Sequence, residues 1–141
     1  MIGRIFSGEF SPRFPPPPRW FGAGESYLVP EASGDLVRYD TATGARRDVL
    51  VPAAQLTPGG ASAPLDVESL AWSADQRRVL IFTNAHRVWR TDSRGDYWVL
   101  DRPAGRLRKL GGDVPEASLM YAAFNPDATK VAYVRRNDIY V

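Results

Sequence analysis

The segment SLAWSADQRRVLIF, at residues 69–82, decides the fold because it occurs twice in the chain. It aligns without a gap with YAAFNPDATKVAYV at residues 121–134, at an offset of 52 residues. In this alignment Trp72 falls on Phe124, and Val79 falls on Val131. A fixed offset of this size between two apolar segments is typical of a protein built from repeated structural units.

A second segment repeats at a different offset. GDLVRYDTATGARRDV at residues 34–49 aligns with GDYWVLDRPAGRLRKL at residues 95–110, at an offset of 61 residues. Both copies contain Asp-x-x-x-Gly, which is a turn signature between two strands. A weaker copy of the first segment lies 52 residues upstream, where Trp72 falls on Trp20. The chain therefore contains three related units.

Each unit predicts short strands joined by turns. The second strand of the middle unit is apolar at successive positions, Val79-Leu80-Ile81-Phe82, which indicates a sheet covered on both faces. Strands are expected near Trp20 and at 26–30, 35–40 and 46–51; at 68–73, 77–83, 96–101 and 105–110; and at 119–124, 130–135 and 138–141. This pattern predicts an all-β fold, a partial β-propeller of about two and a half four-stranded antiparallel blades. A solenoid or an ordinary sandwich is the alternative.

The expected organisation has one domain after a short lead-in. Residues 1–19 are proline-rich and predict an extended segment that crosses the surface, with an SH3-type ligand as the alternative. Residues 20–141 form the propeller portion, with blades at about 20–56 and 66–112 and an incomplete blade at 116–141.

Composition excludes several function classes. The 18 basic and 16 acidic residues give a net charge of +2, which is too balanced to predict binding to nucleic acid. The chain has no cysteine and a single histidine, His86, so neither a zinc cluster nor a Ser-His-Asp triad is predicted and no cofactor is expected. No apolar run approaches the roughly 20 residues of a membrane helix. The N-terminus lacks the layout of a signal peptide, which leaves the compartment undetermined.

One segment exceeds what the repeat requires. Thirteen residues, 83–95, separate the second and third strands of the middle unit, whereas three residues, 135–137, do so in the last unit. Insertions in repeat proteins map to loops on one face, often the binding face. The additional residues, which include Trp89 and Arg90, predict a functional loop; the alternative is a solvated insertion with Trp89 packed beneath it.

The same region resembles a known family. Val88-Trp89-Arg90, the segment from Arg94 to Asp101, and the segment from Lys130 to Val141 with its Asn-Asp-Ile-Tyr-Val ending are similar to the N-terminal propeller of the dipeptidyl peptidase IV family. Arg4 to Phe10 resembles the lead-in to the first blade of that family. The resemblance covers nearly the whole chain, with the proline-rich stretch matching least.

The resemblance implies an activity and a site. Members join an eight-bladed propeller to an α/β-hydrolase domain and remove dipeptides that end in Pro or Ala from peptide N-termini. It implies that Arg90, supported by Trp89, holds a backbone carbonyl of the peptide substrate. It further implies a periplasmic or extracytoplasmic compartment and a possible homodimer.

The family's catalytic machinery is not found in the sequence. The chain contains no Gly-x-Ser-x-Gly nucleophile elbow, so no catalytic residue is predicted within it. The expectation is the N-terminal propeller portion of such a peptidase, acting with a separate hydrolase domain. A non-catalytic binding propeller and a truncated gene product without activity are the alternatives.

Two short motifs have simpler explanations. Arg94-Gly95-Asp96 spells an integrin-binding tripeptide, but Gly95 is expected to supply a tight turn before a strand. His86 is expected to be an ordinary loop histidine.

Overall fold

A computed structural model describes residues 19–88 and 90–141 of the chain. The described residues form eleven β-strands and one short 3-10 helix, η1. In chain order these are β1 (Arg19–Phe21), β2 (Ser26–Pro30), β3 (Leu36–Asp40), β4 (Arg46–Val51), η1 (Ala53–Leu56), β5 (Ser69–Trp72), β6 (Arg78–Val88), β7 (Thr91–Asp101), β8 (Arg106–Lys109), β9 (Leu119–Phe124), β10 (Val131–Arg135) and β11 (Asp138–Tyr140). The prediction of an all-β partial propeller is confirmed.

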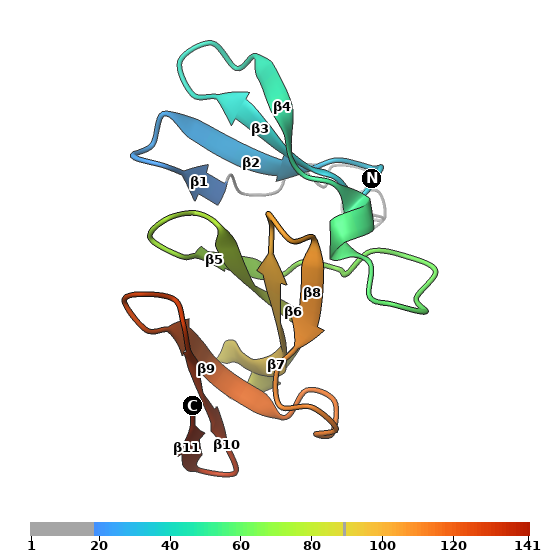
Figure 1. Cartoon of the computed structure of the whole chain (residues 1–141), viewed down its shortest axis with the longest axis vertical. Helices are drawn as coiled ribbons and strands as arrows, with labels where there is room; N and C mark the ends of the chain where they lie inside the picture. The colour runs from blue at the N-terminus through green and yellow to red at the C-terminus, as the bar shows by residue number, and fades with distance from the viewer. Residues whose placement is uncertain (1–18, 89) are drawn as a thin grey trace, which may run out of the picture.

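The strands group into three antiparallel units that follow one another along the molecule (Figure 1). We call them blade one (β1–β4), blade two (β5–β8) and blade three (β9–β11). Within blades one and two each strand pairs with the next along the chain, and β10 pairs with both β9 and β11. Blades two and three also share hydrogen bonds, because β7 pairs with β9 at Arg94–Met120 and Gly95–Leu119. The sequence repeat does not predict this connection.

Strand β6 supplies residues to two hydrophobic cores. Val79 and Ile81 pack with residues of blade one and with Leu100. Leu80 and Phe82, the alternate positions, belong to the second core with Leu119 of blade three. Successive side chains of a strand point to opposite faces, so a strand between two blades must be apolar throughout. The prediction that the strand at Val79–Phe82 is covered on both faces is therefore confirmed.

The repeated sequences form repeated turns. The amide of Ser73 donates to the carbonyl of Arg78 at 2.9 Å, and 52 residues later the amide of Asn125 donates to the carbonyl of Lys130 at 3.1 Å. Asp75 accepts the backbone N–H of Arg77 in the first turn, as Asp127 accepts that of Thr129 in the second. The Ser73 hydroxyl lowers the pKa of Asp75 and the Thr129 hydroxyl lowers that of Asp127, and the two backbone N–H groups add to the effect. The two segments align without a gap because they form turns with the same hydrogen bonds.

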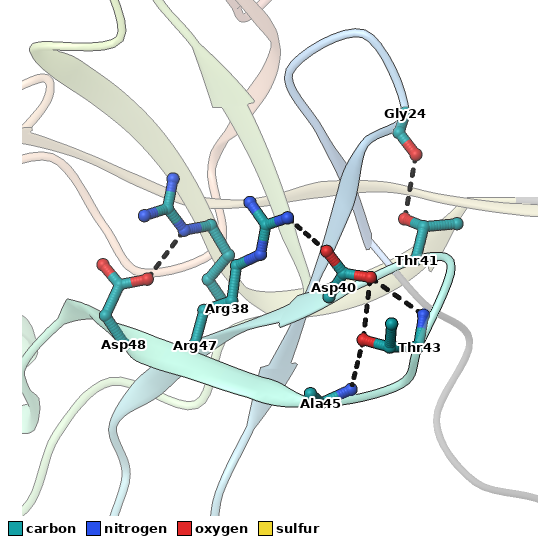
Figure 2. A network of polar contacts seen from close by, with 8 residues as sticks. All are labelled: Gly24, Arg38, Asp40, Thr41, Thr43, Ala45, Arg47 and Asp48. Atoms are coloured by element: carbon teal, nitrogen blue, oxygen red, sulfur yellow. Dashed lines mark hydrogen bonds and ion pairs between the residues drawn. The ribbon is translucent and has the colours of Figure 1, made fainter.

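The Asp-x-x-x-Gly turns also match one another. Asp40 accepts the backbone N–H of Thr43 at 2.8 Å, and Asp101 accepts that of Ala104 at 3.1 Å. Figure 2 shows that Asp40 also accepts the Thr43 hydroxyl and pairs with Arg47 of the next strand. These hydrogen bonds hold the pKa of Asp40 at about 2, well below its ordinary value of 3.8. Asp40 is therefore ionised at neutral pH, and its carboxylate holds the β3–β4 turn in place.

Candidate functional site

The insertion at residues 83–95 is a β-hairpin and not an irregular loop. Strands β6 and β7 continue past the blade as an antiparallel ladder, with the pairs His86–Arg94, Arg87–Asp92 and Val88–Thr91. Only residues 89 and 90 separate the two strands. A ladder satisfies the backbone donors and acceptors of a projecting segment, which a solvated loop leaves to water. We call residues 84–94 the arm.

A β-bulge joins the arm to blade two. The register shifts between the pairs Thr83–Asp96 and His86–Arg94, and Asn84 adopts a left-handed conformation with φ of 51°. A bulge bends its strand and increases the local twist. The bend coincides with the two residue pairs that join β7 to β9, so the base of the arm lies against blade three.

Gly95 occupies the narrowest point of this base. A Cβ atom at Gly95 would lie 2.8 Å from Cζ of Phe82 and 2.6 Å from the backbone oxygen of Thr83. The prediction that Gly95 forms a tight turn is therefore wrong. Gly95 lies within β7, and it is required there because the chain packs directly onto the Phe82 ring.

The buried carboxylate of Asp96 links three segments at the base of the arm. It accepts the Asn84 side-chain amide at 3.0 Å, the backbone N–H of Ala117 at 3.2 Å, and Lys109 Nζ at 3.1 Å. These partners come from the bulge, the segment before β9, and β8. Asp96 is only 5% exposed, so the Arg94-Gly95-Asp96 tripeptide does not present its carboxylate for a partner.

The structure places Arg90 at the tip of the arm. Arg90 is exposed in the turn between β6 and β7. Trp89, predicted to support it, lies outside the described residues. His86, expected in a loop, lies in the paired part of β6 and is exposed. The local signal for a hairpin was the β-branched pair Val88 and Thr91 on either side of a two-residue turn.

An open cleft of about 610 Å³ lies where the arm meets blade three. No sequence pattern predicts this cleft, because its walls come from segments that are distant in sequence. The lining residues are Asn84, His86, Arg94, Glu116, Ala117, Ser118, Met120, Arg136 and Asn137.

No group of three or more His, Cys, Asp or Glu side chains in the described ranges is arranged to hold a metal ion. Within those ranges no helix has the length and apolarity needed to cross a membrane.

Comparison with known proteins gives a consistent assignment. Residues 73–141 match the family model described as the dipeptidyl peptidase IV N-terminal region. The chain is 35% identical over 77 residues to dipeptidyl aminopeptidase B of Saccharomyces cerevisiae, covering 55% of this chain and 9% of that protein. It is 33% identical over 78 residues to a probable dipeptidyl-aminopeptidase B of Aspergillus clavatus, covering 55% of this chain and 8% of that protein.

A solved structure extends the similarity over both sheets. The crystal structure of dipeptidyl peptidase 4 of Porphyromonas gingivalis superimposes with a TM-score of 0.76 at 26% identity, covering 97% of this chain and 19% of that one. The chain thus spans less than a tenth of each of these two relatives and about a fifth of the solved chain. The family match covers residues 73–141, which include the arm and blade three, and the structural match adds blade one; these similarities support an assignment to the N-terminal β-propeller region of the dipeptidyl peptidase IV family.

Proposed function

We propose that this propeller portion serves a serine exopeptidase that removes Xaa-Pro and Xaa-Ala dipeptides from peptide N-termini. The names of the relatives, dipeptidyl aminopeptidase B and dipeptidyl peptidase 4, support the reaction class. In this proposal the propeller gates access to the site and helps to bind the peptide. A separate α/β-hydrolase domain supplies the nucleophile, and no cofactor takes part. An extracytoplasmic compartment and a homodimer belong to the same proposal.

The observation that carries the proposal is the position of Arg90. The arm projects beyond the strands that the propeller requires, and its exposed tip carries a guanidinium. A guanidinium offers several donors in a fixed plane and remains charged at any working pH. Arg90 is therefore suited to donate hydrogen bonds to a peptide carbonyl.

The test uses the full-length product of the gene and a Gly-Pro chromogenic substrate. Hydrogen bonds from a charged donor contribute roughly 1.5–3 kcal/mol, so Arg90→Ala should lower kcat/KM by about ten- to a hundred-fold. Arg90→Lys should restore little, because an ammonium cannot reproduce the planar donor geometry.

Arg108→Ala serves as the control. It removes the same charge from an exposed position on β8, away from the arm, and should leave kcat/KM within about two-fold. Equal losses in the two alanine variants would reduce the effect to general electrostatics and contradict the role of Arg90. Peptide binding without hydrolysis by the full-length product would instead favour a non-catalytic binding propeller.

A further inference from the structure

The cleft between the arm and blade three combines several positive groups with one carboxylate. Arg94 of the arm and Arg136 of the β10–β11 turn both line it, together with His86 and Glu116. All four side chains are exposed, and none forms a hydrogen bond or ion pair with another described residue. The cleft therefore offers guanidinium donors that no other residue of the described ranges uses.

The walls of the cleft are held in place before any ligand binds. Asn84 and Ala117, which both line the cleft, donate hydrogen bonds to the buried carboxylate of Asp96. The two-residue turn Arg136–Asn137 connects paired strands, which fixes where Arg136 leaves the backbone. A pre-formed site loses less conformational entropy on binding than a flexible one.

We propose that this cleft binds a carboxylate of an acidic residue in a peptide. Arginine forks match the geometry of a carboxylate, and the exposed Asn137 and His86 add further polar contacts. The carboxylate of Glu116 in the same cleft disfavours a multiply charged polyanion, and the net charge of +2 agrees with that choice.

The position of the cleft suggests which part of a peptide it would contact. Arg94 of β7 lies four residues after Arg90 of the turn, a separation of at most roughly 13 Å for extended backbone. An extended peptide covers that distance in about four residues. Resting on the proposed function, we infer that the cleft selects substrates with an acidic residue about four positions from the carbonyl held by Arg90.

The test is direct binding to the 141-residue chain. A fluorescent peptide of sequence Ala-Pro-Gly-Ser-Glu-Glu is compared by anisotropy with its Ala-Pro-Gly-Ser-Gln-Gln counterpart, at about 0.15 M ionic strength, where distant charges are screened. Wild type should bind the glutamate peptide about ten-fold more tightly or better. The Arg94→Gln/Arg136→Gln double variant should reduce the affinity ratio to near one.

The control removes equal charge elsewhere. Arg106→Gln/Arg108→Gln changes two exposed residues of β8 and should retain the ratio. Circular dichroism melting of every variant identifies loss of fold, and Arg94→Lys/Arg136→Lys, which keeps the charge but loses the fork, should give an intermediate ratio. Equal affinity of wild type for the two peptides, or equal losses in the two glutamine variants, would overturn the proposal. Because no hydrolysis is measured, this result is independent of the Arg90 test on the full-length product.

Discussion

At the scale of single residues, the arm depends on two positions with opposite requirements. Gly95 must have no side chain, because the Phe82 ring and the Thr83 carbonyl occupy the space beside it. Asp96, the next residue, must carry a carboxylate, because three donors from three segments converge on it. The close packing at Gly95 and the buried charge at Asp96 together fix the angle at which the arm leaves blade two.

Gly95→Ala should lower the free energy of unfolding by roughly 1–3 kcal/mol, as expected when a methyl group is forced into a packed site. The Thr83 oxygen belongs to the backbone of the paired strand, so it cannot move aside without breaking the ladder. Chemical denaturation of the 141-residue chain measures the change. Gly59→Ala is the matched control, since a Cβ atom there meets nothing within 4 Å, and it should change stability by less than about 0.5 kcal/mol. Similar losses in both variants would show that the space around Gly95 is not limiting.

At the scale of elements, Arg102 joins blade one to blade two. Its guanidinium donates to the carbonyls of Gln76 at 2.9 Å and Leu50 at 3.0 Å, and it lies over the Trp72 ring at 5.5 Å from the centroid. Burial lowers the pKa of Arg102, and the two carbonyl partners compensate for part of the lost hydration. A side chain from one turn thereby connects the last strand of blade one to a turn of blade two.

Arg102→Ala should destabilise the chain by roughly 2–3 kcal/mol, because it removes two charged hydrogen bonds and a cation–π contact. Arg102→Lys should recover less than half of that loss, since one ammonium does not span both carbonyls. Urea denaturation measures the series, with the exposed Arg106→Ala as the control for loss of charge. An Arg102→Ala variant as stable as the control would show that hydrophobic packing alone holds the blades together.

The sequence predicted the repeated elements better than the connections between them. The apolar run from Val79 to Phe82 and the two Asp-x-x-x-Gly turns are local patterns, and local patterns indicate strands and turns directly. The hydrogen bond between Ala117 and Asp96 and the hydrogen bond between Arg102 and Leu50 join residues that are distant in sequence, so no spacing predicts them. The arm was expected as a loop because its ladder is polar and lacks the alternation of a half-buried strand. Comparison of the repeats was enough to place Arg90 in the inserted segment. The cleft between the arm and blade three could be found only from the folded structure.

At the scale of the whole molecule, ionised carboxylates recur at the turns and blade edges. Hydrogen bonds to side chains or backbone N–H groups lower the pKa values of Glu31, Asp35, Asp40, Asp75 and Asp127. Each group binds its proton less readily in the folded chain than in the unfolded chain. Their stabilising contributions are therefore complete above the ordinary carboxyl pKa values and are lost as pH falls through the folded values. Because these carboxylates lie in blades one, two and three, the stability of all three blades should fall at acidic pH.

The melting temperature of the chain should consequently change little between pH 7 and pH 5 through these groups, and should fall steeply between about pH 4 and pH 2. The lower limit follows from Asp40, with a pKa of about 2 in the fold against 3.8 ordinarily. Asp40→Asn keeps an oxygen that can accept the Thr43 N–H but loses the charge facing Arg47, so it should melt lower at pH 7 and lose less stability on acidification. Asp113→Asn is the control, because Asp113 is exposed and bonds to no described side chain or backbone group. Scanning calorimetry from pH 7 to pH 2 checks both variants; an Asp40→Asn curve parallel to that of wild type would show that the Asp40 turn does not couple protonation to unfolding.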